Sequence, residues 1–162
     1  SLAAAWEDYD NDGDQDLYIA NDYGKNCLYR NDGGRFSQVA ERAGAVDYGS
    51  GMSVSWADYD RDGWMDLYVG NMFSSAGSRI TSQENFLPQS KHPVRALYRR
   101  FVRGNSCFRN GGDGTFSETS DRSGATTAGW AWSSVFTDLD NDGWEDLFVA
   151  NGYITTPDTG DL

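Results

Sequence analysis

Three aspartate-rich loops are the most informative chemical feature of this 162-residue chain. Each loop has carboxylates at its positions 1, 3, 5 and 9, a glycine at position 6 and a backbone carbonyl at position 7. The twelve carboxylates belong to Asp8, Asp10, Asp12 and Asp16; to Asp58, Asp60, Asp62 and Asp66; and to Asp138, Asp140, Asp142 and Asp146. Position 7 is Asp14, Trp64 or Trp144. A chain that turns tightly at the glycine gathers these oxygen atoms around one centre.

Oxygen ligands in this arrangement favour Ca²⁺, which takes about six to eight of them at about 2.3–2.6 Å in flexible geometry. Without a cation, four aspartates so close together would repel one another, and their pKa values would rise. The sequence repeats this unfavourable cluster three times. We therefore predict three Ca²⁺ sites and no catalytic residues, and three bound ions would halve the formal net charge of −12.

Two other metal sites fit this spacing less well. An EF-hand needs a bidentate glutamate at position 12, leading into a helix, whereas position 12 here is Ile19, Val69 or Val149 within a strand-like pattern. Mg²⁺ keeps several waters, and four carboxylates with a carbonyl leave little room for them. Calcium is therefore the predicted cofactor.

Repeated segments around the loops predict the elements that position them. Each loop follows an aromatic residue, and a second motif, Cys27–Asn31, recurs as Ser106–Asn110. Short alternation of apolar and polar residues between Gly, Asp and Asn turns indicates strands. We expect strands near 2–7, 17–20, 27–30 and 36–40, then near 52–57, 67–70, 106–109 and 116–120, and finally near 132–137 and 147–150. The predicted fold is all-β, with about two and a half four-stranded antiparallel units.

The second unit is interrupted by an insertion over 72–104 that is rich in basic residues. It holds six of the thirteen in the chain, and five of these lie in its second half: Lys91, Arg95, Arg99, Arg100 and Arg103. Pro93 suits a first helical turn, and residues 95, 99 and 103 share one face of a helix. We expect one short helix here, with His92 in a loop. The basic face either pairs with the acidic surface of this protein or docks an acidic neighbour or anionic glycan.

Composition excludes several functional classes. A net charge of −12 and an isoelectric point near 4.2 argue against a nucleic-acid partner, because phosphate backbones are bound by clustered cations. No apolar run approaches the roughly 18 residues of a membrane span, so we expect no membrane insertion. Aromatic residues make up 14% of the chain, which favours a packed core over a disordered acidic chain. A single histidine excludes chemistry that needs paired histidines.

Cysteine and tryptophan residues leave more than one interpretation open. Cys27 and Cys107 are either buried free thiols or form a disulfide, within or between chains. Trp6, Trp56 and Phe136 share one repeat position and are expected in the core. Four other tryptophans could stack on sugar rings: Trp64, Trp130, Trp132 and Trp144. The sequence begins at Ser1 without a visible secretory leader, which suggests a processed or partial product.

The loops, with the Leu-Tyr-Ile or Leu-Tyr-Val segments that follow them, resemble FG-GAP/VCBS repeats, the blades of integrin-α-type β-propellers. A second resemblance, to bacterial relatives of cartilage acidic protein (the CRTAC/ASPIC-UnbV group), is carried by residues 71–77, 103–110, 130–134 and 151–154. The resemblance covers essentially the whole chain. It implies propeller-type blades, a secreted or cell-surface location and no established enzymatic activity. On this basis we expect a single domain, 1–162, with blade 1 at about 2–45, blade 2 at about 50–125 and a partial blade 3 at about 130–162.

Two and a half blades cannot close a propeller, and open edges favour association. We therefore expect a non-catalytic, extracellular calcium-binding module that serves as a structural or adhesive surface unit. Its predicted partners are further copies, in an oligomer or filament, or the remainder of a larger propeller. Donation of the tail near 152–162, or of the N-terminal strand, to another copy is a further route.

Two functions of other classes remain open beside this expectation. One is a carbohydrate-binding module, with a glycan as partner. The other is a polysaccharide-acting hydrolase or lyase, which would need a pair of carboxylates outside the loops. The spare acids are Glu7, Glu41, Glu84, Glu118 and Glu145.

Overall fold

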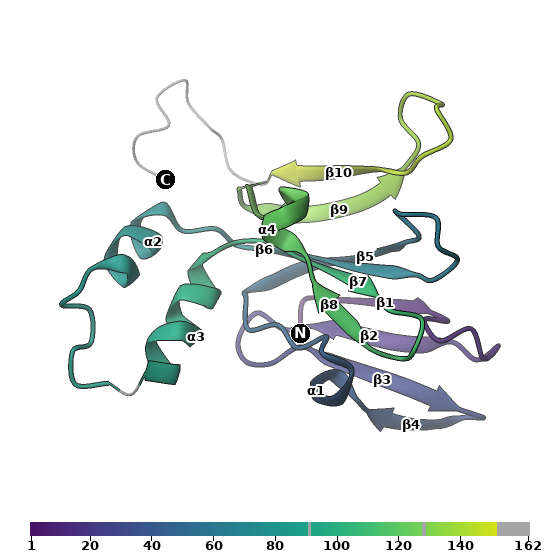
Figure 1. Cartoon of the computed structure of the whole chain (residues 1–162), viewed down its shortest axis with the longest axis horizontal. Coiled ribbons are helices and arrows are strands. Elements are labelled where there is room, and N and C mark those ends of the chain that lie inside the picture. The colour runs from purple at the N-terminus through teal and green to yellow at the C-terminus, as the bar shows by residue number, and fades with distance from the viewer. Residues whose placement is uncertain (91, 128, 152–162) are drawn as a thin grey trace.

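The computed structural model describes residues 1–90, 92–127 and 129–151, which form three antiparallel sheets with short helices (Figure 1). The first sheet, blade 1, contains in order β1 (Ala3–Glu7), β2 (Asp16–Ala20), β3 (Cys27–Asp32) and β4 (Arg35–Gln38). The second, blade 2, contains β5 (Gly51–Ala57), β6 (Asp66–Asn71), β7 (Ser106–Asn110) and β8 (Phe116–Glu118). The third, the half-blade, pairs β9 (Ala131–Thr137) with β10 (Asp146–Asn151).

This architecture confirms the predicted all-β fold of two four-stranded units and half of a third. All ten predicted strands are present, with ends that differ by at most two residues. The alternation of buried and half-buried residues along β2 reflects one face in the core, whereas β6 is buried throughout because blade 2 has a neighbour on each side. The tail near 152–162 lies outside the described residues.

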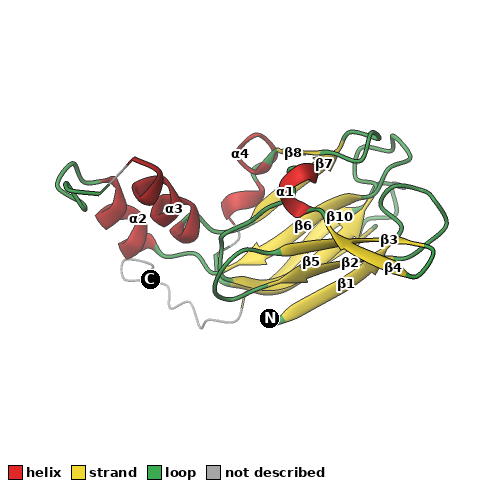
Figure 2. Ribbon diagram, turned by 90° about the horizontal axis from the view of Figure 1, so that it is seen from below, coloured by secondary structure: helices red, strands yellow, loops and turns green. Residues whose placement is uncertain are grey.

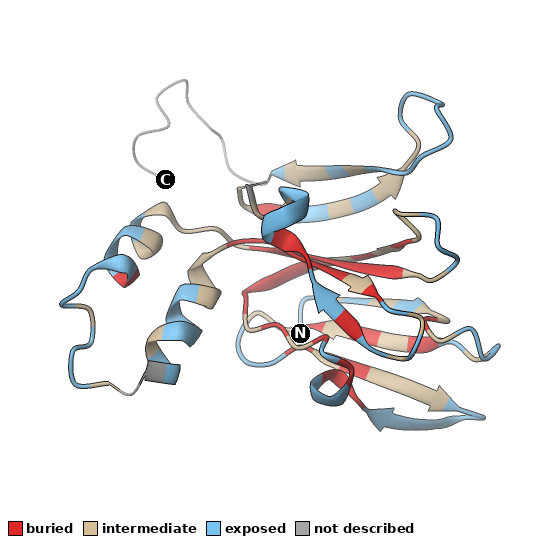
Figure 3. Ribbon diagram, in the orientation of Figure 1, coloured by how far each residue is buried: buried red, intermediate tan, exposed pale blue. Residues whose placement is uncertain are grey.

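The core lies between blades 1 and 2, where most of the buried side chains gather (Figure 3). The Trp56 ring meets the Tyr18 ring edge-on at 6.2 Å and the Phe116 ring at 6.1 Å. Tyr18 is fully buried, and its hydroxyl donates to the Ala45 carbonyl at 2.9 Å. Blades 1 and 2 are thus joined by aromatic packing rather than by strand pairing.

One expectation about the core is wrong. Trp6 occupies the same repeat position as Trp56 and Phe136, but it is 55% exposed. Trp56 packs against blade 1 and Phe136 packs against Tyr68 of blade 2, whereas Trp6 packs only against Phe36 of its own sheet among the described aromatic pairs. The repeat position therefore faces the preceding blade, and no blade precedes β1 in the described residues.

A one-turn helix follows each complete blade. These helices are α1 (Ala40–Ala43) and α4 (Ser120–Ser123), and the 3₁₀ turn η1 (Ala125–Thr127) follows α4. Both helices end at a glycine in the left-handed region, Gly44 with φ 72° and Gly124 with φ 74°. Such a cap is ordinary for glycine and strained for other residues, so the repeat of this glycine has a structural cause.

The insertion holds two helices, where the sequence predicted one. These are α2 (Ser75–Ser82) and α3 (His92–Val102), which pack together and project from one end of the sheets (Figure 2). Helix α2 begins because the Ser74 side chain accepts a hydrogen bond from the Gly77 amide at 2.9 Å, which is a typical N-cap. His92, expected in a loop, is the first residue of α3, and Pro93 lies in its first turn as predicted.

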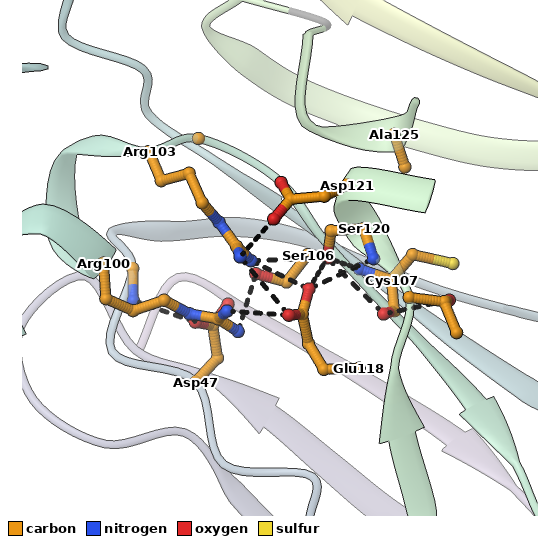
Figure 4. Close-up of polar contacts among 12 residues, drawn as sticks. Asp47, Arg100, Arg103, Ser106, Cys107, Glu118, Ser120, Asp121 and Ala125 are labelled. Atoms are coloured by element: carbon orange, nitrogen blue, oxygen red, sulfur yellow. Dashed lines mark hydrogen bonds and ion pairs between the residues drawn. The ribbon is translucent and has the colours of Figure 1, made fainter. Parts of the chain in front are cut away.

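A polar network fastens α3 to blade 2 and to the linker between α1 and β5 (Figure 4). The Arg100 guanidinium lies 3.0 Å from the fully buried Asp47 carboxylate and 3.4 Å from Glu118 of β8. Arg103 lies 2.9 Å from the same glutamate, and Asn71 donates to Asp47 at 2.8 Å. Burial alone would raise the pKa of Glu118, but bonds from Arg103 and Ser120 and the Arg100 charge lower it to about 2.

The expectation that the basic residues of the insertion pair with acidic groups of this protein is therefore confirmed only in part. Arg100 and Arg103 pair with acids of this protein. Arg95 and Arg99 instead donate to backbone carbonyls near the end of α2, those of Gln83 and Thr81. These carbonyls have no helical partner at a C-terminus, which explains why they attract guanidinium groups. Lys91 lies outside the described residues.

The structure decides the state of both cysteines. Cys27 and Cys107 are free thiols. Cys107 is buried below α4, and burial raises the pKa of its thiol. A reactive cysteine nucleophile has a lowered pKa, so the buried Cys107 thiol lacks that environment.

Candidate metal centres

The three predicted metal loops join paired strands at the same end of the sheets, opposite the helical insertion (Figure 1). We call residues 8–16 loop 1, residues 58–66 loop 2 and residues 138–146 loop 3. In each, the hairpin places position 9 at the start of the returning strand. The last carboxylate is therefore held by a sheet and the others by the turn.

The first aspartate closes each turn. In loop 1 the Asp8 carboxylate accepts hydrogen bonds from the amides of Asp12 and Gly13, at 3.0 and 2.9 Å. Equivalent bonds are present in loops 2 and 3. The glycine at position 6 has a φ between 87° and 93° in all three loops, which only glycine adopts without strain. The same backbone frame is thus built three times.

This frame brings carboxylates together. In each loop, oxygen atoms from three aspartates lie within 4.8 Å of one another. The trios are Asp8, Asp10 and Asp16; Asp58, Asp60 and Asp62; and Asp138, Asp140 and Asp146. The predicted ligands Asp12 and Asp142 lie outside their trios. In all three loops the position-5 aspartate accepts the position-7 amide. Asp66 is also outside its trio, and the carbonyls of Asp14, Trp64 and Trp144 stay predicted ligands.

Several of these oxygen atoms are buried without a hydrogen-bond donor. Within the described residues, Oδ1 of Asp10, Oδ1 of Asp60 and Oδ2 of Asp66 have no hydrogen-bond partner. Burying a carboxylate oxygen without a partner is costly, and a bound cation would remove that cost. Hard oxygen donors in a flexible loop are the set that Ca²⁺ prefers, so the residues fit the metal that the sequence predicts.

The third strand of each complete blade buries the position-9 carboxylate. Asn31 of β3 donates its backbone N–H to Asp16 at 2.8 Å, and Asn110 of β7 donates its own to Asp66 at 2.7 Å. Both carboxylates are fully buried, and burial raises the pKa of Asp16 to about 6 and that of Asp66 to about 7. Sequence reasoning did not assign this role to Asn31 and Asn110, although each occupies the same position in the repeated second motif.

Loop 3 has the same frame in a more open setting. Asp146 is exposed, and it accepts a hydrogen bond from the Leu139 amide at 3.1 Å. Among the described residues no third strand pairs with β10. The three loops therefore share the bonds made by their first aspartate and differ in what surrounds position 9.

Loop 2 carries a counter-charge. Arg109 of β7 donates to Asp60 and to Asp62, both at 2.5 Å. The equivalent residue in blade 1, Arg30, pairs instead with Asp32, at 2.9 Å. Asp60 and Asp62 both belong to the loop 2 trio, so this trio faces a cation.

A comparison with protein families shows which family the chain belongs to. The profile of the FG-GAP-like repeat matches residues 8–69 and 97–149, which include all three loops. The chain belongs to the FG-GAP-like repeat family. Members of this family are generally structural or binding modules and are typical of extracellular proteins. Curated proteins give no match to the chain.

The FG-GAP loops also contact one another. The Asn11 side chain of loop 1 donates to the Gly63 carbonyl of loop 2 at 3.1 Å. The Arg61 guanidinium of loop 2 lies 4.3 Å from the centre of the Trp144 ring in loop 3, a cation–π distance. Residues at position 4 of one loop thus reach positions 6 and 7 of the next, so neighbouring loops form a continuous surface.

Two of the spare acids outside the FG-GAP loops, Glu41 and Glu118, are engaged in ion pairs. Glu41 pairs with Lys25, and Glu118 pairs with Arg100 and Arg103. The pKa of each glutamate is lowered, by the Lys25 hydrogen bond for Glu41 and, against burial, by two arginines for Glu118. A general acid needs a raised pKa near the working pH, so these two glutamates are suited to structural roles.

No helix in the described ranges is long and apolar enough to span a membrane. Of the tryptophans predicted as sugar platforms, Trp144 is covered on one face by Arg61, and Trp64 packs against the β7–β8 turn, where a Cβ on Gly112 would lie 2.7 Å from its indole nitrogen. Trp132 is 51% exposed.

Proposed function

We propose that this protein is a non-catalytic, extracellular calcium-binding repeat module that serves as a structural or adhesive surface unit. One observation carries the proposal: three loops of identical backbone frame each gather aspartate oxygens within 4.8 Å, and buried oxygens in loops 1 and 2 lack any donor in the described residues. The ion proposed for each loop is Ca²⁺.

Calcium would act on folding rather than on chemistry. An ion that binds only the folded loops stabilises the protein, by about 2.7 kcal/mol for each site at a concentration of about 100 times the dissociation constant. The loops are joined by the Asn11–Gly63 and Arg61–Trp144 contacts. Ordering one loop would therefore help to order its neighbour, and the calcium end of the blades would become rigid.

The open faces of the array support the structural part of the proposal. Tyr18 meets Trp56, and Tyr68 meets Phe136, each edge-on at 6.2 Å. The next aromatic at the tyrosine position is Phe148, 51% exposed, and the unmatched aromatic at the other end is Trp6. We propose that each meets its missing counterpart on another copy of this chain, or on the remainder of a larger propeller.

We also propose a kinship with the cartilage acidic protein-like (CRTAC/ASPIC-UnbV) group. The supporting residues are the stretches at 71–77, 103–110, 130–134 and the start of 151–154. Two of them border the helical insertion of blade 2.

Calorimetric titration with Ca²⁺ tests the metal proposal. Wild-type protein should bind three ions, and a variant with Asp10→Asn, Asp60→Asn and Asp140→Asn should lose all three, because each change removes a trio carboxylate. Asp121→Asn is the matched control, since this aspartate is exposed on α4. Absence of binding heat in the wild type, or full binding by the triple variant, contradicts the proposal.

Light scattering tests the assembly proposal on the same samples. Calcium-loaded protein should form particles larger than one chain, and Trp6→Ser should reduce their size. A single-chain mass for the wild type at every protein concentration rules out self-association and leaves only the larger propeller.

Carbohydrate binding is the second candidate, and the exposure of Trp132 favours it, because exposed aromatic faces can stack on sugar rings. A glycan array compares wild-type protein with Trp132→Ala. Loss of a wild-type signal in the variant supports a glycan partner, and turnover of any polysaccharide would instead indicate the hydrolase or lyase class.

A further inference from the structure

Two arginines on equivalent strands meet the FG-GAP loops in different ways. Arg30 of β3 and Arg109 of β7 each precede the asparagine whose backbone amide donates to the position-9 carboxylate. The two strands also share one register, because the residue before each arginine pairs with the leucine that directly follows the loop. The two arginines therefore start from the same place, one beside loop 1 and the other beside loop 2.

Arg109 turns into the loop beside it. Its guanidinium donates to Oδ2 of Asp60 and to Oδ2 of Asp62, both at 2.5 Å, and both carboxylates belong to the loop 2 trio. Oδ1 of Asp62 accepts the Trp64 amide at 3.0 Å, so each oxygen atom of this carboxylate has a donor. An ion that used Asp62 as a ligand through Oδ2 would therefore have to displace Arg109.

Arg30 is held away from loop 1 by an acid of its own strand. Its Nε and Nη2 atoms both donate to Oδ2 of Asp32, at 3.2 and 2.9 Å. Asp32 lies two residues after the arginine, at the end of β3. The residue two positions after Arg109 is Gly111, which has no carboxylate to offer. The Arg109 guanidinium pairs with the carboxylates of loop 2 instead.

We infer that the residue two positions after the third-strand arginine sets the calcium affinity of the loop in each complete blade. Asp32 holds Arg30 aside and leaves loop 1 open to an ion, whereas Gly111 lets Arg109 serve as a built-in counter-cation of loop 2. Calcium must compete with this tethered charge, which lowers its apparent affinity, so loop 1 fills before loop 2. The inference rests on the proposed calcium sites and names the residues that make two of them unequal.

A double-mutant cycle in blade 1 tests the inference by calcium titration. Asp32→Asn should free Arg30 to enter loop 1 and weaken Ca²⁺ binding there severalfold, whereas Arg30→Gln alone should change the affinity little. Added to Asp32→Asn, however, Arg30→Gln should restore the lost affinity. Two charges that act without moving give additive effects, so such coupling reports a movement of the guanidinium. The two side chains are 35% and 47% exposed, so neither change disturbs the core.

The stability of calcium-free protein gives a second readout, which needs no bound ion. In excess EGTA, Arg109→Gln should lower the melting temperature by about 2–4 °C, because the loop 2 aspartates lose the charge that offsets their repulsion. In saturating Ca²⁺ this loss should disappear, since the ion takes over from the guanidinium. Arg30→Gln is the matched control, because Arg30 pairs outside loop 1, and it should melt close to wild type in both conditions.

NMR of the position-6 amides separates the two loops in the titrations. The Gly13 amide reports loop 1 and the Gly63 amide reports loop 2, and Gly63 should titrate as in wild type in every blade 1 variant, which also shows that the variant is folded. If both loops bind Ca²⁺ but the effects of Asp32→Asn and Arg30→Gln add, or Arg109→Gln melts with wild type in EGTA, the inference is overturned while the calcium proposal stands. If neither loop of the wild type binds Ca²⁺, both fail.

Discussion

Blade 2 and the half-blade carry the same loop in different surroundings. In blade 2 the position-9 carboxylate, Asp66, is fully buried under Asn110, and in the half-blade its counterpart, Asp146, is exposed. The bonds made by the first aspartate are the same in the two loops. An aspartate-rich loop of this type is thus shaped by its own sequence, but it is enclosed by the third strand of its blade.

The packing between blades differs in the same way as the loops. Between blades 1 and 2 the aromatic side chains of β7 and β8 fill the core. Between blade 2 and the half-blade the equivalent space is an open cavity of about 470 Å³. The chain can therefore be probed by matched substitutions, in which one residue lies in a closed environment and its repeat equivalent lies in an open one.

The largest contrast is expected for two tryptophans. Trp56→Ala should lower the free energy of unfolding by about 3–5 kcal/mol, because it leaves a cavity between blades 1 and 2. Trp6→Ala should cost much less, since this ring is 55% exposed. Urea unfolding of calcium-loaded protein at low concentration measures both. Equal losses would mean that the Trp6 face is also covered.

A smaller contrast is expected for the two asparagines of the third strands. Asn110→Ala removes side-chain bonds to Met65 and Tyr9 from a fully buried site and should cost about 1–3 kcal/mol. Asn31→Ala should cost less, because that side chain is only partly buried and makes one such bond, to Gln15. Thermal unfolding measures the stability lost in each variant. A larger loss for Asn31→Ala than for Asn110→Ala would contradict the expected difference between the two blades.

Replacement of Arg109 should moderately change the Ca²⁺ affinity of loop 2 alone. Arg109→Gln removes the guanidinium that pairs with Asp60 and Asp62, and a cation beside a metal site opposes a second cation. We expect a severalfold gain in Ca²⁺ affinity at loop 2, equivalent to about 1 kcal/mol. Arg30→Gln is the control, because Arg30 pairs with Asp32 outside loop 1. Unchanged affinity in Arg109→Gln would show that the arginine does not compete.

The smallest expected effect is on the pH dependence of folding stability, through Glu118, which pairs with Arg100 and Arg103 of α3. The pKa of Glu118 is lowered from 4.5 to about 2 in the folded protein, so its ionised form stabilises the fold above pH 4.5. That contribution is lost as the pH falls from about 4.5 to about 2. Glu118→Gln should flatten this part of the stability curve relative to wild type, as measured by urea unfolding across the window. A parallel curve for the variant would assign the loss to other carboxylates.

The repeat made much of this fold predictable from the sequence. The loops and strands recur with short alternating patterns, so their positions followed from local chemistry. The second helix of the insertion did not, because its start depends on the Ser74 cap rather than on an apolar pattern. The exposure of Trp6 was also missed, since a repeat position does not reveal whether a neighbouring blade is present.

For the candidate sites, the sequence predicted the residues within the loops but not the residues that contact the loops from other strands. Aspartate spacing predicted the ligands, but the contacts of Asn110 and Arg109 depend on which strand lies beside a loop in space. Both residues are more than 40 positions from the loop that they contact. Spacing along the chain carries no such information.

The most direct measurement is a calcium titration followed by NMR at the position-6 amides of Gly13, Gly63 and Gly143. Each amide donates to the first carboxylate of its own loop at 2.9 Å, so each reports one site. We predict that all three resonances shift and saturate, with Gly143 saturating at a higher Ca²⁺ concentration than Gly13, because loop 3 is the more open. If none of the three shifts with added Ca²⁺, the loops are not calcium sites and the account is wrong.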